Sequence, residues 1–380
     1  MAQTLRTDWT LFVTIVVMVC LGLVFVYSAS STVATLKFEK ESHYFLLRQA
    51  VYAVLGFSVL MWFKRIDYRK LCSPLWAFGG MGVVVFCLLL VYFLDPKTHR
   101  WFRFGSLSIQ PSEFAKPALA IFLAWFLSRR LHVINGKHTL LPALFSVLLM
   151  GVVVVFPDFG TALVLVFTAL TVFFVAGLNK RYLALVMLLG LLLGVYTIYS
   201  KPYRFGRVVH HFDPERKHLY LLVKHFGLEP YLNRSAANRD PTYQVRQSKI
   251  AIGSGGILGV GLMQSKQKLF YLPEAHTDFI YAVVGEEAGL WGCGAILFGF
   301  LIIAWRGFQL FWLATDDFGR YLALAITVSI VFQAFVNLSV VLGMLPTKGI
   351  PLPMISNGGS SLLSTLTQLG ILLSVRERAA

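Results

Sequence analysis

The sequence predicts an all-α, polytopic membrane protein, and three observations indicate this class. Of the 380 residues, 57% are hydrophobic and 14% are charged, and the mean hydropathy is +0.70. The apolar residues form blocks long enough to cross a bilayer as helices, which takes about 20 residues each. Basic residues recur in alternate connections between these blocks. A soluble domain of this length is far more polar, so we expect a single membrane domain over residues 1–380, without a separate soluble domain.

Ten apolar blocks predict ten transmembrane helices. Their expected ranges are Leu11–Ser28, Leu47–Phe63, Leu75–Leu94, Glu113–Ser128, Leu140–Phe156, Gly160–Gly177, Tyr182–Tyr199, Phe279–Trp305, Tyr321–Gly343 and Ser360–Val375. The first block is longer than the apolar part of a signal peptide, which predicts an uncleaved anchor. The connection between the seventh and eighth helices, about residues 200–278, is large, and structureless loops of this length are uncommon. We expect short helices within it and a more polar insertion at Glu215–Asp240.

The positions of lysine and arginine predict which side each connection faces, because cytoplasmic connections are enriched in these residues. The connections after the second, fourth, sixth and eighth blocks are basic, as is the C-terminal tail. The residues concerned are Lys64, Arg65, Arg69, Lys70, Arg129, Arg130, Lys137, Lys180, Arg181, Arg306, Arg320, Arg376 and Arg378. We therefore expect both termini in the cytoplasm and the long connection outside. The net charge of +16 is spread between the blocks, which fits orientation or contact with anionic lipid or pyrophosphate and argues against a nucleic-acid partner.

The stretch FYLPEAHTDFIYAVVGEEAG leads into the eighth block and places Glu274, His276 and Asp278 directly before it. Ionisable residues at a membrane helix are costly and usually functional. Asp278 could instead cap the N-terminus of the helix, so both roles stay open. Further along the same helix, Glu286 and Glu287 are expected to be polar groups used in helix packing.

The sequence QPSEFAK at the start of the fourth block contains Gln110, Ser112, Glu113 and Lys116. Glu113 and Lys116 are three residues apart, so they share a helix face and can pair. Such a pair inside a membrane bundle could fix two helices to each other. Alternatively, the lysine faces a substrate anion and the glutamate orients it.

Two more of the expected outer connections carry polar groups. Asp158, in the sequence PDFGT, either caps the sixth helix or lines an outer cavity. The last connection contains Lys348, and Ser360 and Ser361 at its end could cap the tenth helix, whose N-terminus would attract an anion. Together these groups predict one outward-facing cavity with acids, cations and a helix N-terminus. Carboxylates and cations beside lipid fit group transfer from a lipid-linked phosphate.

Five stretches together resemble the SEDS family of shape, elongation, division and sporulation proteins. They are FRFGSLSIQPSEFAK, PDFGTA, the segment Gln247–Gly261, LPEAHTDFIYAVVGEEAGLWG and LPTKGIPLPMISNGGSS. Their order and spacing match the family over almost the whole chain, and the PTKG at Pro346–Gly349 resembles the division branch more than the elongation branch. Two features depart from the family pattern. Asn357 stands where the family usually has tyrosine, and the long connection is extended between Asp213 and Tyr243.

The resemblance implies a ten-span peptidoglycan glycosyltransferase of the bacterial inner membrane, which polymerises lipid II into glycan strands at the outer face during cell division or elongation. The implied partners are lipid II, the growing glycan strand, a class B penicillin-binding protein that crosslinks the strands, other divisome or elongasome membrane proteins, and membrane lipid. The family's catalytic aspartate falls on Asp278, and its functionally sensitive tryptophan falls on Trp101. Gln110 to Lys116 and Asp158 match its other polar motifs.

From this resemblance we expect Asp278, beside His276, to take the proton of the acceptor hydroxyl. The leaving pyrophosphate would be stabilised by Lys116, Arg103, Lys348 or a divalent cation such as Mg²⁺ or Mn²⁺. The expected substrate-binding residues are Trp101, Arg103, Gln110, Ser112, Glu113, Lys116, Asp158, His276, Lys348 and Ser360. Two other functions stay open, a flippase or transporter of lipid II and a non-catalytic scaffold for a penicillin-binding protein. A flippase needs polar groups reaching both sides, whereas here they crowd the outer half.

Overall fold

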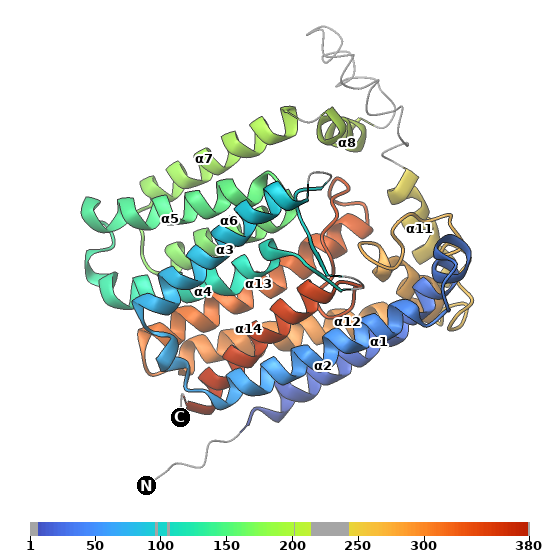
Figure 1. The fold of residues 1–380 in the computed structure, drawn as a ribbon, viewed down its shortest axis with the longest axis horizontal. Helices are drawn as coiled ribbons and strands as arrows, with labels where there is room; N and C mark the ends of the chain where they lie inside the picture. The colour runs from blue at the N-terminus through green and yellow to red at the C-terminus, as the bar shows by residue number, and fades with distance from the viewer. Residues whose placement is uncertain (1–6, 96–97, 105–106, 201, 214–242, 379–380) are drawn as a thin grey trace, which may run out of the picture.

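The computed structural model describes residues 7–95, 98–104, 107–200, 202–213 and 243–378, which form a bundle of long helices lying side by side (Figure 1). The two described ends of the chain meet, because the Thr7 hydroxyl donates a 2.7 Å hydrogen bond to Glu377 Oε1. We call this side of the bundle the terminal end and the other side the opposite end. This contact agrees with the predicted even number of membrane crossings, which would bring both ends of the chain to one side.

A helix overlaps each of the ten predicted ranges to within two residues at either end of the range, and further helices lie in the long connection. The α-helices are α1 (Trp9–Phe38), α2 (Tyr44–Arg65), α3 (Pro74–Leu94), α4 (Pro111–Arg130), α5 (Lys137–Val155), α6 (Phe159–Val175), α7 (Lys180–Tyr199), α8 (Pro202–Phe212), α11 (Tyr243–Gly255), α12 (Ile280–Leu313), α13 (Asp317–Val341) and α14 (Gly359–Arg378). Short 3₁₀ turns lie at Tyr68–Leu71 and Leu131–Val133. The predicted insertion at Glu215–Asp240 lies outside the described residues.

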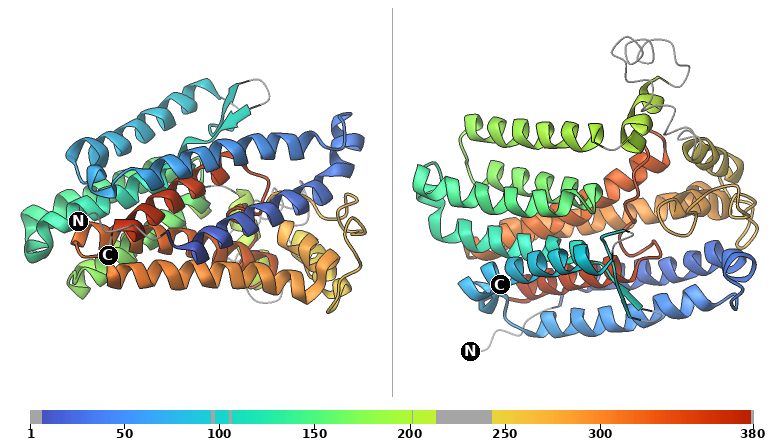
Figure 2. Two further views of the ribbon diagram at one scale, coloured as in Figure 1. Left: turned by 90° about the horizontal axis from the view of Figure 1, so that it is seen from below. Right: turned by 45° about the horizontal axis from the view of Figure 1, so that its top comes forward.

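Six of these helices are long and apolar enough to cross a membrane: α1, α2, α3, α7, α12 and α13. The described parts of α5 and α6 form shorter apolar helices. α4 and α14 are more polar, and both are buried along most of their length. Polar side chains are tolerated there because the two helices face protein rather than lipid. At the edge of the bundle, α7 has a single buried residue, Thr197, and lies along one side (Figure 2).

Among the described residues, the most extensive contact between two helices joins α14 to α2. A side-chain β-carbon on Gly370 would lie 2.7 Å from the Leu60 carbonyl, and one on Gly56 would lie 2.5 Å from the Leu366 side chain. Small residues of this kind let membrane helices approach each other closely. The last helix of the chain is therefore packed against the second.

A two-stranded antiparallel hairpin connects α3 to α4, which corrects the expectation of a purely helical protein. Strand β1 (Phe102–Phe104) pairs with β2 (Leu107–Ile109), and Arg103 lies opposite Ser108. The Tyr52 hydroxyl of α2 accepts a 2.9 Å hydrogen bond from the Ser108 amide and donates a 2.8 Å bond to its carbonyl. These bonds fix the hairpin on α2.

α12 consists of two helices joined at Gly289, which corrects the single span predicted over Phe279–Trp305. Gly289 has φ 63° and ψ −155°, a conformation that glycine adopts without steric cost. The Tyr281 hydroxyl donates a 3.3 Å hydrogen bond to the Cys293 carbonyl. A continuous helix would separate these residues by about 18 Å along its axis, so the chain turns sharply at Gly289. The part after the break, 290–313, is long enough to cross a bilayer by itself.

Basic residues of the predicted cytoplasmic connections pair with acids at the terminal end. Arg306 and Arg376 each lie 3.8 Å from Asp8, and Lys64 lies 3.3 Å from Glu377. Asp8 also caps α1 by accepting a 3.0 Å hydrogen bond from the Leu11 amide. The ends of the chain and these connections therefore form one polar cluster.

Candidate active site

Asp278 lies at the opposite end, in the segment directly before α12. Its backbone carbonyl accepts a 2.8 Å hydrogen bond from Asn337 Nδ2 of α13. The residue is half-buried, and among the described residues the carboxylate accepts no hydrogen bond. The N-cap of α12 is Phe279, without a side-chain capping bond. The alternative role of Asp278 as a helix cap is therefore wrong.

The Asp278 carboxylate lies against the loop between α13 and α14. A β-carbon on Gly349 would be only 2.5 Å from Asp278 Oδ2, so the absence of a side chain at Gly349 permits this approach. The same loop is bonded to the backbone of the Asp278 segment. Ser356 donates a 2.6 Å hydrogen bond to the Thr277 carbonyl, and the Asn357 amide donates a 3.1 Å bond to the His276 carbonyl.

Asp278 has the properties of a base poised near neutral pH. Burial raises its pKa to about 7, and the negative charges of Glu274 and Asp158 act in the same direction. The positive charges of Lys348 and Arg207 oppose the rise. Burial and like charges both disfavour the ionised carboxylate. A base whose pKa lies close to the working pH is the most effective proton acceptor.

Asp158 joins the starts of α4 and α6. Its carboxylate accepts hydrogen bonds from the amides of Gly160 (3.1 Å) and Thr161 (3.3 Å), which confirms that it caps α6. It also accepts bonds from Gln110 Nε2 (3.0 Å) and the Ser112 hydroxyl (3.5 Å). Three residues predicted from two separate motifs are thus in contact.

The charge state of Asp158 differs from that of Asp278. Burial acts to raise the pKa of Asp158, but the charges of Arg100 and Lys348 and the hydrogen bonds of Thr161 outweigh it and hold the pKa below the ordinary value. Asp158 is therefore ionised at neutral pH. The negative charge of Asp158 raises the pKa of Asp278, and the positive charge of Lys348 acts to lower the pKa of both carboxyl groups.

Glu113 and Lys116 form the predicted ion pair, at 2.7 Å and almost fully buried. Lys116 Nζ also donates a 2.6 Å hydrogen bond to Gln333 Oε1 of α13, and Gln333 Nε2 donates a 2.8 Å bond to the Pro351 carbonyl. Ser364 of α14 donates a 2.7 Å bond to the Glu113 carbonyl. The pair thus links α4 to α13, to α14 and to the loop that touches Asp278.

The other predicted site residues lie around this centre in different surroundings. Trp101 and His276 are half-buried, and Arg103 is exposed on the hairpin. The His276 ring lies 5.3 Å from the Phe45 ring, and burial together with Lys37 lowers its pKa. His276 is therefore neutral at pH 7.

Lys348 lies in the loop between α13 and α14, and Ser360 lies in the first turn of α14. Lys348 Nζ lies 5.1 Å from the centre of the Phe159 ring, above the start of α6. Ser360 is buried and accepts a 2.9 Å hydrogen bond from the Gln110 amide, so its hydroxyl ties the hairpin region to α14. The start of α14 is covered, because a β-carbon on Gly359 would collide with the Tyr52 ring at 2.2 Å. The expected open helix N-terminus is therefore not found at this position.

Three residues near Asp278 were not predicted as site residues: Asn337, Gln333 and Gly349. A signal for the first two exists, because they are amide side chains inside an apolar block, where polar groups are costly. Asn337 donates hydrogen bonds to the carbonyls of both Asp278 and Ile350, at 2.8 and 2.7 Å. Its own Oδ1 is buried without a partner among the described residues.

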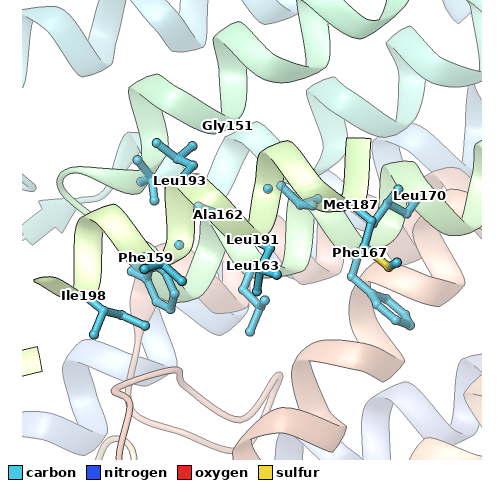
Figure 3. Close-up of a pocket in the computed structure, with 15 residues that line it drawn as sticks. Gly151, Phe159, Ala162, Leu163, Phe167, Leu170, Met187, Leu191, Leu193 and Ile198 are labelled. Atoms are coloured by element: carbon cyan, nitrogen blue, oxygen red, sulfur yellow. The ribbon is translucent and has the colours of Figure 1, made fainter. Parts of the chain in front are cut away.

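A groove with a volume of about 340 Å³ runs between α6 and α7 (Figure 3). Its lining is apolar and includes Phe159, Leu163, Phe167, Met187 and Leu191. Phe159, which contacts Lys348, follows Asp158 directly in the chain. The polar site and the apolar groove therefore adjoin at the start of α6.

A metal-binding cluster is not formed by the described part of the chain. No three His, Cys, Asp or Glu side chains there come close enough together to hold a metal ion. The predicted divalent cation therefore has no ready three-ligand site among these residues.

Fold and site together define a multi-pass helical membrane protein in which the candidate site residues Asp278, Asp158 and Lys348 lie at the opposite end of the bundle. The chain belongs to the FtsW/RodA/SpoVE family, because the family model described as "Cell cycle protein" matches residues 8–380. This confirms the family resemblance of the sequence.

Similar proteins cover nearly the whole chain. "Probable peptidoglycan glycosyltransferase FtsW" of Geobacter sulfurreducens is 38% identical over 98% of this chain and 96% of its own length. "Stage V sporulation protein E" of Bacillus subtilis is 35% identical over 97% of this chain and 96% of its own length.

Two solved structures share the fold. Rod shape determining protein RodA of Thermus thermophilus has a TM-score of 0.66 and 28% identity, over 98% of this chain and 97% of the other. A chain of the structure described as "Structural coordination of polymerization and crosslinking by a peptidoglycan synthase complex" has a TM-score of 0.73 and 28% identity, over 99% of both chains.

Proposed function

We propose that this protein is a peptidoglycan glycosyltransferase that polymerises lipid II, with Asp278 as the general base. The observation that carries the proposal is Asp278: the residue is half-buried, its carboxyl pKa is raised to about 7 by burial, and the charges of Lys348 and Arg207 act on it. A base and cations at one place serve a reaction in which a hydroxyl loses a proton and a phosphate leaves. The names of the relatives agree with this activity.

In the proposed reaction, the 4-hydroxyl of the acceptor GlcNAc attacks C1 of the donor sugar at the end of the growing strand. The hydroxyl proton passes to an oxygen of Asp278 as the new C–O bond forms. The bond from C1 to the pyrophosphate oxygen breaks, and undecaprenyl pyrophosphate leaves with the electron pair. The negative charge that develops on it is stabilised by cations. Lys348 and Arg207, whose charges influence Asp278, suit this role better than Lys116, which is bonded to Glu113 and Gln333.

The remaining predicted site residues are proposed to hold the substrate. Arg103 and Trp101 lie at or near the exposed hairpin and are suited to contacts with the sugars. Gln110, Ser112 and Asp158 fix the starts of α4 and α6 around Lys348. Glu113, Lys116 and Ser360 act from buried positions by holding these elements together.

The apolar groove between α6 and α7 is proposed to hold part of the polyprenyl chain. Its end at Phe159 adjoins Asp158 and Lys348, so a lipid there would present its phosphate to the cations. Gly194 lines the groove and has open space around its α-carbon. Gly194→Leu is expected to raise the KM for lipid II with a full-length chain, but not for an analogue with a short chain.

We further propose that ten helices cross the bacterial inner membrane, with both termini in the cytoplasm and residues 200–278 outside. The basic cluster at the terminal end and the contact of Thr7 with Glu377 support this orientation. It puts Asp278 at the outer face. Reporters fused after Arg65 or Arg181 should report cytoplasm, and a reporter near Asn233 should report the outside.

A class B penicillin-binding protein is proposed as the partner that crosslinks the strands, together with other divisome or elongasome membrane proteins. A chain from a described peptidoglycan synthase complex matches this fold over 99% of its length. The PTKG sequence and the name FtsW among the relatives favour the division branch.

The test uses the full-length protein in lipid bilayers, with and without its penicillin-binding protein, and labelled lipid II. Glycan chains should form, and Asp278→Asn should abolish them. Translocation of lipid II without polymer would indicate the flippase alternative. A partner that polymerises equally well with wild-type protein and with Asp278→Asn would indicate a scaffold.

A further inference from the structure

We infer that Ser28, Lys268 and Glu287 form a clasp that positions Asp278 and thereby controls turnover. The inference rests on the proposed function. Lys268 Nζ lies 2.8 Å from Glu287 Oε1 and donates a 3.1 Å hydrogen bond to Ser28 Oγ. The Ser28 hydroxyl in turn lies 2.6 Å from both carboxylate oxygens of Glu287. The three side chains come from α1, from the segment before Asp278 and from α12.

The clasp closes the segment that carries Asp278. Lys268 stands ten residues before Asp278, and Glu287 stands nine residues after it. The two ends of residues 268–287 are therefore joined by an ion pair, with the proposed base near the middle. The orientation of this segment depends on where its ends are held.

The clasp cannot touch the substrate directly in this structure, because its members are almost completely buried. Relative exposure is 0% for Ser28, 3% for Lys268 and 2% for Glu287. A buried ion pair adds little net stability compared with apolar side chains of similar volume, because both charges lose their hydration. The pair instead fixes the position of Lys268 relative to Glu287, and with it the two ends of residues 268–287.

The backbone around the clasp is held on both sides of Lys268 and Glu287. The Glu286 carboxylate accepts hydrogen bonds from the Ser265 hydroxyl (2.5 Å) and the Lys266 amide (2.9 Å). The carbonyls of Glu286 and Glu287 accept bonds from two amides after α11, at 2.9 and 3.0 Å. This approach requires glycine, since a β-carbon on Gly259 would lie 2.1 Å from the Glu287 carbonyl oxygen. Lys268 is thus presented to Glu287 by a fixed turn.

Helix α1 connects the clasp to the other side of Asp278. Ser28 joins it to Glu287, and Gly22 packs against the Met354 carbonyl, where a β-carbon would lie 2.2 Å away. Met354 belongs to the loop between α13 and α14 that touches Asp278 through Gly349. The same helix therefore contacts both the segment that carries the base and the loop against which the base packs.

The test compares two charge-neutral double variants of the full-length protein in bilayers with its penicillin-binding protein. Lys268→Met/Glu287→Gln removes the clasp's charges without leaving one unpaired. Lys64→Met/Glu377→Gln does the same to a partly buried Lys–Glu pair at the terminal end, whose side chains are 15% and 10% exposed. The measurements are kcat and KM for lipid II, the pH profile of kcat and the melting temperature. Ser28→Ala is a milder variant that removes only the hydrogen bonds of the Ser28 hydroxyl to Glu287 and Lys268.

We expect kcat of the clasp variant to fall by about 10- to 100-fold, because a displacement of about 1 Å at a reacting group costs rate on this scale. KM should change little, and the apparent pKa of the kcat profile should shift because the surroundings of Asp278 change. Ser28→Ala should lower kcat by a smaller factor. The control pair should keep the wild-type kcat and pH profile.

A clasp variant with wild-type kcat and pH profile would overturn the inference and leave the proposed function intact, since the wild-type protein would still polymerise. A loss of kcat equal to that of the control at equal loss of melting temperature would also overturn it, because the clasp would then be structural only. A wild-type protein that makes no glycan contradicts the proposed function, and the inference with it.

Discussion

The side-chain amide of Asn337 donates a 2.8 Å hydrogen bond to the backbone carbonyl of Asp278. The same nitrogen donates a 2.7 Å bond to the carbonyl of Ile350. One buried amide on α13 therefore holds together the segment with the proposed base and the loop that packs against that base.

Asn337→Asp, a change that nearly keeps the shape of the side chain, should lower the rate of polymerisation by more than any loss of folding stability explains. The new carboxylate cannot donate to the two carbonyls, and its charge would lie beside Asp278. We expect kcat to fall by about 100-fold, as for other small displacements of a reacting group. Asn135→Asp is the comparison for loss of a donated bond, since Asn135 donates a 3.4 Å hydrogen bond to the Gly177 carbonyl from an exposed position between α4 and α5. Equal kcat values for the two variants would contradict the positioning role of Asn337.

Asp278→Asn should keep the fold and lower polymerisation by about 10²–10⁴, the usual effect of removing a general base. Asparagine has nearly the same shape but cannot accept the proton. The measurement is glycan chain length from labelled lipid II. Asp158→Asn serves as the comparison, because asparagine can still cap α6. Normal chains from a folded Asp278→Asn protein would remove Asp278 from the mechanism.

The pH dependence of kcat should follow the ionisation of Asp278, which must be unprotonated to act as a base. With a pKa of about 7, the rate should rise with pH through neutrality and level off above it. Glu274→Gln removes a negative charge that raises this pKa, so the profile should move to lower pH. Lys348→Met removes an opposing positive charge, so the profile should move to higher pH. If the pH profiles of kcat of both variants matched that of the wild-type protein, the ionisation of a group other than Asp278 would control the rate.

The raised pKa of Asp278 also predicts that folding stability falls with rising pH, whereas the rate rises. The ordinary pKa of an aspartate is 3.8, and the folded protein holds this proton more tightly than the unfolded chain. Folding stability is therefore lost as the pH rises from about 4 to about 7. Asp278→Asn, which carries no charge, should melt at a higher temperature than the wild-type protein at pH 8 and lose this advantage at pH 4. Equal melting temperatures at pH 8 would show that Asp278 is not destabilised by its surroundings.

Gly349→Ala should displace the Asp278 carboxylate, because the added β-carbon would lie 2.5 Å from Oδ2. The backbone at this position does not require glycine, so we expect a large loss of kcat with a small change in melting temperature. Gly358→Ala is the matched control in the same loop, where the nearest atom would be 3.6 Å away. An active Gly349→Ala protein would mean that the carboxylate has room to move without losing function.

Single changes of Glu113 or Lys116 to alanine should cost about 3–5 kcal/mol of unfolding free energy, because each leaves a buried charge unpaired. Exchanging the two residues should recover part of this loss. The measurement is the melting temperature in detergent together with turnover. Loss of turnover without loss of stability would instead favour direct contact of Lys116 with the substrate.

Local sequence patterns predicted the helices well because each depends on a long apolar block or on a short capping signal. The Glu113–Lys116 pair and the Asp158 cap follow from spacing along a single helix, so they too could be predicted. The break at Gly289 could not, because it is stabilised by residues after α11 that bond to the carbonyls of α12. The hairpin depends in the same way on Tyr52 of α2. Contacts of this kind join distant parts of the chain, and no periodicity records them.

The role of Asp278 could not be predicted from its position in the sequence. A residue directly before an apolar block can be a helix cap or a base, and the start of α12 at Ile280, with Phe279 as its N-cap, excludes only the cap. Ser360 was predicted as a helix cap, and its hydroxyl has a different partner in the structure. It begins an apolar block as a cap would, but its hydroxyl is used by the hairpin region through Gln110.

The packing of α14 against α2 has a consequence for how this protein is made. During synthesis, α2 enters the membrane long before Gly370 and Leu366 exist, so the surface around Gly56 and Leu60 must wait for its partner. α4 and α14 are also too polar to be stable among lipids on their own, and they need their neighbours in place. Folding of this bundle can therefore finish only after α14 has been synthesised, and a ribosome that stalls before Gly359 leaves a chain in which α2 and α4 lack the helix they pack against.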